Sequence, residues 1–334
     1  MSIIGEGRVV YGIQLPVQSQ SSMFVADWER DAGPDELVAI ARAADDAGFF
    51  YVAVCDHVAI PGRLASAMGT TWYDTVATLG LLAGVTTRTR LLSHVAVLPL
   101  RHPLISAKAF ATLDHLSKGR LIIGVGAGHV PEEFAQLGVA FERRGALLDE
   151  AIDALSTALI DEFPTFDGPT WSFDDAGQSP RPVQSPRPPI WVGGSSPAAI
   201  RRAAERGDGW LPQGTPRAKM PEQIAALRAR RQQARPADPI DIGVNCEFCY
   251  VGQPGWDVGD GVLTGTPAAI AESLNEYVSM GVNQLQVRFK SRSAAECCDQ
   301  LAAFGADVGP LLGPSPERRE ERAPAAAAPA SPHG

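Results

Sequence analysis

Residues 88–144 constrain the fold more than any other part of the chain. Residues 90–98 form an almost unbroken apolar run, and residues 120–125 form a second, shorter one. Between the two runs, Pro103 opens a segment whose apolar side chains recur at helical spacing. Continuous apolar strands are typical of parallel sheets, which are buried on both faces. The glycine-rich residues 124–128 follow the second run, at the strand end where α/β folds bind ligands.

The same alternation of strand and helix repeats about eight times along the 334 residues. The pattern predicts strands over residues 9–15, 50–55, 90–98, 120–125, 189–192, 209–211, 240–251 and 284–289. It predicts helices over residues 34–47, 73–84, 103–116, 144–161, 197–206, 216–234, 267–280 and 293–308. Eight such units favour an α/β fold of the closed (β/α)8 type, a TIM barrel.

Three segments depart from this alternation. Residues 163–188 are rich in Pro, Gly and Asp and contain a pattern that predicts a small hairpin. Residues 59–72 form a polar loop after the second strand, where a loop can act as a lid. We therefore expect a barrel domain over residues 1–313 with insertions in its βα loops. Residues 314–334 lack apolar periodicity, so we expect a disordered tail there.

Charge and hydropathy exclude several classes of partner. The net charge of −9 argues against a protein that binds nucleic acid. No segment has the pattern of a membrane span or a signal peptide, so we expect no membrane association and a cytoplasmic protein.

The five cysteines do not predict a metal site. Cys246 and Cys249 lie in a strand-like segment, where residues three apart are expected to point to opposite faces. No second cysteine pair or histidine cluster completes a zinc site. An odd count without regular spacing is consistent with reduced thiols.

A turn at the end of the fifth predicted strand has the features of an anion site. Gly193 and Gly194 are followed by Ser195 and Ser196, and either serine can cap a helix that begins at Pro197. A helix N-terminus presents free N–H groups to an anion, and glycines let the backbone approach it closely. The alternative is an ordinary tight turn between strand and helix.

Two polar residues follow the second predicted strand. Asp56 and His57 should both point to the mouth of the barrel. A histidine there can exchange protons near neutral pH, so His57 is a candidate general acid or base. The alternative is a histidine that only bonds to neighbouring loops.

Several long phrases of the chain resemble the bacterial luciferase-like superfamily. They are PLRHP, ATLDHLSKGRLIIGVGAGH, EEFAQLGVAFERRG and PPIWVGGSSPAAIRRAAERGDGW, and the resemblance spans residues 12–312. Within that superfamily the chain is most similar to oxidoreductases that use the deazaflavin coenzyme F420. The resemblance implies hydride transfer between F420 and a small organic substrate, with the cofactor's phosphate held by residues 193–196.

The resemblance also implies where the deazaflavin ring lies. It places Asp56 against the ring and makes His57 the proton donor or acceptor. It places a bulge with a non-proline cis peptide at His94-Val95, against the back of the ring.

The loop after the fourth strand has an implied role as well. Gly126, Ala127, Gly128 and His129 would lie along the ribityl chain, and His129 would also line the substrate pocket. Gln18 and Trp72 are weaker candidates for lining that pocket. Glu132 and Glu133 are interpreted as mainly structural, because carboxylates suit the first turn of a helix.

Two alternatives to the F420 enzyme stay open. One is an FMNH2-dependent monooxygenase on the same scaffold, which would need a flavin reductase as partner. The other is a non-catalytic protein that binds flavin or deazaflavin. The resemblance further implies a homodimer.

Overall fold

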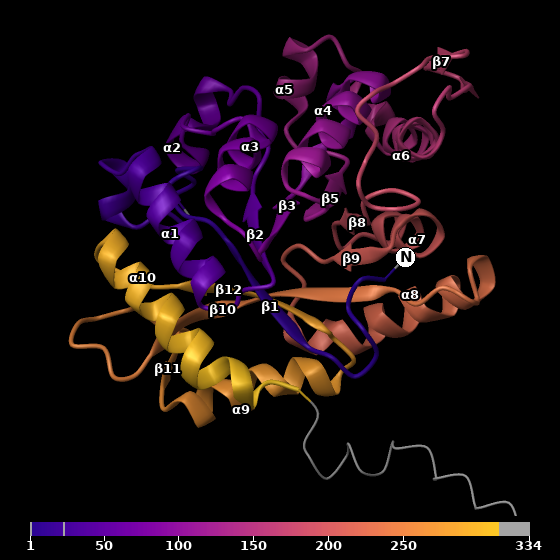
Figure 1. The fold of residues 1–334 in the computed structure, drawn as a ribbon. Coiled ribbons are helices and arrows are strands. Elements are labelled where there is room, and N and C mark those ends of the chain that lie inside the picture. Colours follow the sequence, from indigo (N-terminus) through magenta and orange to yellow (C-terminus); the bar gives the residue numbers. More distant parts are fainter. Residues whose placement is uncertain (1, 23, 314–334) are drawn as a thin grey trace, which may run out of the picture.

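The computed structural model describes residues 2–22 and 24–313. The disordered tail predicted for residues 314–334 lies outside the described residues. Eight parallel strands close into a barrel in the order β1-β2-β3-β5-β8-β9-β10-β12, and β12 pairs with β1 (Figure 1). The strands are β1 (Val10–Gln14), β2 (Tyr51–Val54), β3 (Arg90–Ser93), β5 (Leu121–Gly126), β8 (Ile190–Gly193), β9 (Gly209–Leu211), β10 (Asp241–Val251) and β12 (Gln284–Phe289). The predicted TIM barrel is confirmed.

Helices surround the barrel (Figure 1). The principal ones are α1 (Pro34–Asp46), α3 (Thr75–Val85), α4 (Pro103–Leu116), α6 (Arg144–Ile160), α7 (Pro197–Arg206), α8 (Met220–Ala234), α9 (Pro267–Ser279) and α10 (Ala294–Ala303). Proline occupies the first or second position of α1, α4, α7, α8 and α9, as expected of a residue with no N–H to satisfy. No helix among the described residues is both long and apolar enough to cross a bilayer.

Shorter elements decorate this frame. They are β4 (Ala96–Val97), β6 (Phe166–Asp167), β7 (Ser172–Phe173), β11 (Leu263–Gly265), α2 (Ala65–Met68), α5 (Pro131–Gln136), and a π-helical turn over Phe304–Val308 that continues α10. β6 and β7 pair antiparallel, so the hairpin predicted within residues 163–188 is present. The loop over residues 59–72 contains α2; its role as a lid stays a prediction.

Two hydrophobic cores stabilise the barrel. The larger lies between the strands and the helices. The smaller fills the interior, where the rings of Tyr51 and Trp191 meet edge to face with centroids 5.9 Å apart. Gly12 of β1 leaves space for this packing, because a Cβ there would lie 2.4 Å from the Tyr51 ring.

The N-terminal end of the barrel is closed by the start of the chain. The carboxylate of Asp241, at the first residue of β10, accepts hydrogen bonds from the backbone N–H groups of Ile3 and Ile4 at 3.0 and 3.3 Å. The interior below the mouth is therefore packed, and ligands are restricted to the C-terminal ends of the strands.

The strand predicted over residues 90–98 is interrupted. β3 ends at Ser93, the peptide between His94 and Val95 is cis, and β4 follows. Both pieces pair with β5, through Leu91 opposite Leu121 and Ala96 opposite Val125. The bulge and cis peptide implied by the resemblance are thus present at the expected pair.

Cys246 and Cys249 do not point to opposite faces, so the prediction from their spacing was wrong. A β-bulge between Asn245 and Phe248 adds one residue to β10, which breaks the alternation of its two faces. The two cysteines consequently lie in the same hydrophobic core. The expected lack of a metal site is not tested by this result, although no cluster of three candidate ligands occurs among the described residues.

Candidate functional site

Asp56 fastens the end of β2 to the bulge of the neighbouring strand. Its carboxylate is 5 % exposed and accepts two hydrogen bonds from the guanidinium of Arg101, at 2.6 and 2.7 Å. It also accepts one from the N–H of Val97 at 2.8 Å. Both oxygens are thus engaged by protein groups. The structure brings Asp56 next to the bulge, where its clearest role is to hold β4 in place. Its place against the deazaflavin ring stays a prediction.

His57 is held by the carboxylate of Glu133, which the sequence analysis interpreted as mainly structural. Its Nδ1 lies 3.1 Å from Oε2 of Glu133, which has no exposed surface. The other oxygen of Glu133 accepts hydrogen bonds from the N–H groups of Val58 and Ala59 at 2.6 and 3.1 Å. The carboxylate therefore fixes both the ring of His57 and the start of the following loop.

The protein environment keeps Glu133 ionised. Burial acts to raise the pKa of its carboxyl, but the hydrogen bond and charge of His57 and the N–H groups of Val58 and Ala59 outweigh burial and lower the pKa. The interpretation of Glu133 as merely suited to a helix start was incomplete. No local sequence signal could have predicted this contact, because only the folded barrel brings the acidic residue on α5 next to the loop after β2.

Two aromatic rings surround His57 on the mouth side. The ring of Trp72 lies edge to face with the imidazole, with centroids 4.5 Å apart, and the ring of His129 lies 5.3 Å away. Residues from the loops after β2 and β5 thus converge on one imidazole. The predicted pocket residues Trp72 and His129 are brought together at this point.

Gln18 is placed differently from the other pocket candidates. Its side chain is fully buried and its Oε1 accepts a hydrogen bond from the N–H of Cys55 at 3.1 Å. Its Nε2 donates to the carbonyl of Leu15 at 3.1 Å. Gln18 therefore braces the end of β2 from behind and does not line an open cavity.

Val95 joins the bulge to the two glycine-rich loops. A Cβ on Gly126 would lie 2.4 Å from Cγ2 of Val95, and one on Gly193 would lie 2.8 Å from Cγ1. Glycine at both positions lets β5 and β8 approach the bulge closely. Gly128 is also constrained, because its φ is +79° and a Cβ there would lie 2.6 Å from the ring of Phe134. These three glycines are therefore required by packing around one point of the mouth.

His94 is buried beside the bulge and stays neutral. It is 6 % exposed, and its Nε2 lies 3.2 Å from Nε2 of Gln213. Burial, together with the positive charge of Arg288, lowers the pKa of His94 to about 3. An uncharged imidazole is thus presented to whatever lies against the bulge.

The turn after β8 forms the predicted helix start. Ser196 caps α7, since its Oγ accepts from the N–H of Ala199 at 3.2 Å. Ser195 is used otherwise, because its Oγ bonds to the backbone of Gln213 on the neighbouring loop. Within the described part of the chain, the N–H groups of Ser195, Ser196 and Ala198 donate to no protein acceptor. This end of α7 can therefore receive an anion.

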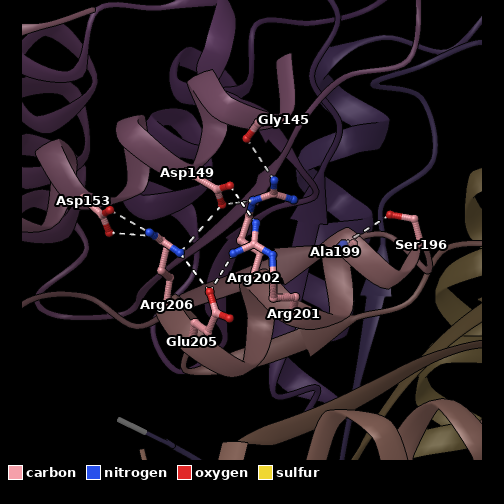
Figure 2. Close-up of polar contacts among 9 residues, drawn as sticks. All are labelled: Gly145, Asp149, Asp153, Ser196, Ala199, Arg201, Arg202, Glu205 and Arg206. Atoms are coloured by element: carbon pink, nitrogen blue, oxygen red, sulfur yellow. Dashed lines mark hydrogen bonds and ion pairs between the residues drawn. The ribbon is translucent and has the colours of Figure 1, made fainter. Parts of the chain in front are cut away.

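An ion-pair network fixes α7 against α6 (Figure 2). Asp149 of α6 accepts hydrogen bonds from Arg202 at 2.7 Å and from Arg201 at 2.8 Å. Arg206 pairs with Asp153 of α6 at 3.0 Å. Figure 2 shows that the network lies on the helix that Ser196 caps. The position of the anion site thus depends on contacts one to three turns along α7.

The site combines three chemical capacities at the C-terminal ends of the strands. Free N–H groups at the start of α7 can hold a phosphate, Val95 and the glycines beside it form a close-packed wall, and the Glu133-oriented His57 can exchange a proton. Such a set is suited to a phosphorylated cofactor whose planar part lies at the mouth beside a proton donor.

A family model described as Luciferase-like monooxygenase matches residues 14–254. An uncharacterised protein of Mycobacterium tuberculosis is 31 % identical over 219 residues, covering 62 % of this chain and 75 % of the relative. The F420-dependent glucose-6-phosphate dehydrogenase of Intrasporangium calvum is 27 % identical over 341 residues, covering 87 % of this chain and 99 % of the relative. Among solved structures, monooxygenase RslO1 of Streptomyces bottropensis superposes with a TM-score of 0.76 at 22 % identity, covering 90 % of this chain and 99 % of that one.

Proposed function

The chain belongs to the luciferase-like monooxygenase family, and from that premise we propose that it is an oxidoreductase that transfers a hydride between coenzyme F420 and a small organic substrate. The observation that carries the proposal is His57 oriented by Glu133, directly after Asp56, which binds the strand piece that follows the bulge at His94-Val95. The similarity to an F420-dependent dehydrogenase over 87 % of this chain supports the choice of cofactor.

The residues present suit the group that the family implies. F420, when bound, supplies the carbon centre that accepts or donates the hydride. The free N–H groups of Ser195, Ser196 and Ala198 would hold its phosphate. Val95, Gly126 and Gly193 meet within van der Waals distance and would form the wall behind the ring.

The protein's own contribution to the reaction is the proton. Since Nδ1 of His57 faces Glu133, Nε2 is the atom left for exchange with the substrate. The buried carboxylate orients the ring. Trp72 and His129 limit the movement of the ring and the access of water to it.

The proposal extends to partners and setting. We expect a small-molecule substrate, a homodimer and a cytoplasmic location. The FMNH2-dependent monooxygenase is the second candidate, because it would use the same anion site and the same wall; it would require a reductase as partner.

Calorimetric titration of the purified full chain with F420, and in parallel with FMN, tests the proposal. We expect F420 to bind at least about tenfold more tightly than FMN. A preference for FMN, followed by oxygen uptake when a flavin reductase is added, would replace the proposed function with the monooxygenase. Binding of neither would contradict both enzymes and the anion site itself.

A further inference from the structure

A valine with a left-handed backbone conformation lies directly after β1, at the mouth of the barrel. Val17 has a φ of +72°, and the N–H of Gln18 donates to the carbonyl of Pro16 at 2.8 Å, so the three residues form a γ-turn. A β-branched side chain makes a positive φ unfavourable, and such a conformation persists only where neighbouring contacts hold it. Since strained backbone is concentrated at functional sites, the contacts of this turn indicate what it does.

Glu29 is the residue that holds the turn. Its side chain is 5 % exposed, and its two carboxylate oxygens accept hydrogen bonds from the N–H groups of Val17 and Ala26, both at 2.8 Å. Trp28, the residue before it, fixes this part of the loop, because its indole N–H donates to the carbonyl of Ser291 at 3.1 Å. A buried carboxylate is costly unless hydrogen bonds satisfy it. Here the hydrogen bonds that satisfy the charge are also those that hold the unfavourable backbone.

Gln18 bonds to both segments of the chain that meet at His57. Its side chain is fully buried, and its Oε1 accepts from the N–H of Cys55, two residues before His57, at 3.1 Å. Its carbonyl accepts from the N–H of Tyr73, one residue after Trp72, at 2.9 Å. The rings of His57 and Trp72 are the ones whose centroids lie 4.5 Å apart. Gln18 therefore fixes the backbone beside each of two rings that contact one another.

The loop after β1 and the loop after β2 pair closely at this point. Ser19 and Trp72 form an antiparallel β-bridge, and the N–H of Gln20 donates to the carbonyl of Thr71 at 3.1 Å. The two loops leave no room for a further side chain, because a Cβ on Gly69 would overlap the carbonyl oxygen of Gln20. A displacement of the first loop would therefore move the backbone of Trp72.

Val17 differs from the other non-glycine residues of the described chain that have a positive φ. Lys118 and Asp175 have φ values of +57° and +49°, both are exposed, and they lie after α4 and after β7. Such places tolerate the left-handed conformation. Val17 is 1 % exposed and β-branched, and a buried carboxylate binds its N–H. The turn at Val17 is therefore part of the packed mouth and not an ordinary loop end.

We propose that Glu29 and Gln18 are positioning residues for proton exchange at His57: Glu29 holds the γ-turn, and the turn sets Gln18 so that the ring of Trp72 stays against the imidazole. This inference deepens the proposed function and rests on it, since it concerns the positioning of the same proposed acid or base. Both residues would act through the backbone of the two loops. Loss of the contact would let the imidazole leave its reactive orientation, and small misplacements of a reacting group reduce rates strongly.

The histidine C–H resonances of the full chain test the contact by NMR without any cofactor. His57→Asn identifies the His57 resonance, and Trp72→Leu gives its position without the indole ring. Glu29→Gln places an amide NH2 opposite one of the two N–H groups, and Gln18→Met leaves the N–H of Cys55 without its acceptor. Both should move the His57 resonance from its native position towards that in the Trp72 variant. A native position in both variants would overturn the proposal.

A substitution in the second loop perturbs the same contact from the other side. Gly69→Ala should displace the His57 resonance in the same direction, because the new Cβ overlaps the loop after β1. Gly62→Ala is the matched control, since a Cβ there would meet nothing within 4 Å. Gln253→Met and Glu272→Gln, at exposed positions, are the controls for the two polar substitutions. Equal displacement in the variants and their controls would overturn the proposal, because the resonance would then report only general loosening.

A rescue experiment separates positioning from a purely structural role. Glycine adopts a φ of +72° without strain, so in Val17→Gly the turn should persist and the His57 resonance should stay native. Adding Val17→Gly to Glu29→Gln should bring the resonance back towards its native position, since the turn no longer needs to be held against an unfavourable φ. A double variant displaced further than Glu29→Gln alone would overturn the proposal, because Glu29 would then support the fold and not the turn.

Measurements with F420 separate this proposal from the proposed function. Glu29→Gln should lower kcat on the order of 10- to 100-fold and leave the affinity for F420 unchanged, because the anion site lies at α7. A displaced His57 resonance in a chain that does not bind F420 would keep the positioning of the imidazole and remove the F420 enzyme. Tight F420 binding with an undisplaced resonance would keep the enzyme and remove the roles of Glu29 and Gln18.

Discussion

Nδ1 of His57 lies 3.1 Å from Oε2 of Glu133, although 76 residues separate the two in the sequence. The contact joins the loop after β2 to the helix α5 that follows β5. Since Glu133 also accepts from the N–H groups of Val58 and Ala59, one buried carboxylate sets both the orientation of the imidazole and the path of the loop. The candidate acid or base is therefore held by a pair of elements that only the closed barrel brings together.

Replacing His57 by asparagine should reduce turnover by roughly 10²- to 10⁴-fold, which is the usual contribution of a general acid or base. Steady-state kinetics with F420 and calorimetric F420 binding are measured together. The affinity for F420 should be retained, because the anion site at α7 is untouched. His115→Asn, at an exposed position of α4, is the control. Normal turnover in the His57 variant would assign it a purely structural role.

Glu133→Gln should lower turnover on the order of 10- to 100-fold, as loss of a histidine's orienting partner does elsewhere. The amide can still accept from Val58 and Ala59 but presents an NH2 group or a neutral oxygen to His57. The control is Glu132→Gln, one residue away, whose side chain is 38 % exposed and pairs with Arg63. If Glu133 positions His57 for proton exchange, the pH profile of kcat should change in the Glu133 variant. An unchanged profile and an unchanged rate would show that Glu133 only supports the loop.

His94 should make the protein less stable in acid. Burial and the charge of Arg288 lower its folded-state pKa from 6.5 to about 3, so below pH 6.5 the unfolded chain takes up a proton that the folded chain excludes. The resulting loss of unfolding free energy is about 2 kcal/mol at pH 5 relative to pH 8. Urea denaturation of the native chain and of His94→Gln at both pH values measures it. Between pH 8 and pH 5 the native chain should lose about 2 kcal/mol more unfolding free energy than His94→Gln. An equal loss in the two proteins would contradict a neutral, buried His94.

Gly194→Ala should weaken F420 binding about tenfold, since a non-glycine residue at an unfavourable φ costs about 1–3 kcal/mol. Gly194 has a φ of +106°, and a Cβ there would lie 3.1 Å from Cβ of Ala199 on the first turn of α7. The backbone of the turn would have to shift to relieve the unfavourable φ or the close approach to Ala199, and that shift would displace the N–H groups that bind the anion. Gly255→Ala is the control, because its Cβ would meet nothing within 4 Å. Equal F420 affinity of the two variants would separate this turn from the cofactor.

Asp149→Ala should lower the free energy of unfolding by about 2 kcal/mol, because it removes two charged hydrogen bonds and leaves Arg202 unpaired. The side chain of Arg202 is only 4 % exposed. Asp46→Ala, which removes an exposed pair with Arg88, should cost less than about 0.5 kcal/mol. Thermal and urea unfolding compare the three proteins. A similar effect of both substitutions would mean that the network between α6 and α7 contributes little.

Local signals predicted most of the barrel. α4 and α7 begin at Pro103 and Pro197, as expected, and Ser196 caps α7, because the signals that start a helix act within a few residues. The interruption of the strand at His94 and the bulge in β10 were harder to predict from the sequence. An apolar run says nothing of where a strand bends, so residues 90–98 had the pattern of one strand, and only the resemblance pointed to the break.

Site residues could be predicted where their place depends on following a strand directly, and less well where it depends on contacts between distant parts of the chain. Asp56, His57 and the serines after Gly194 sit directly after strands, so their place at the mouth could be inferred. The roles of Glu133 and Gln18 could not, because each depends on partners brought close by the fold: an imidazole 76 residues away for one, the N–H of Cys55 for the other.

Trp28, on the short helical turn Asp27–Arg30 after β1, gives the protein a built-in optical reporter. Its indole N–H donates to the carbonyl of Ser291 at 3.1 Å, so the ring is fixed while one face remains accessible. Trp191 and Trp210 are each 1 % exposed and respond only when the barrel opens. Trp72, Trp171 and Trp256 are half-buried like Trp28, so the emission of the unlabelled chain combines a surface signal from four indoles with a fold signal from Trp191 and Trp210.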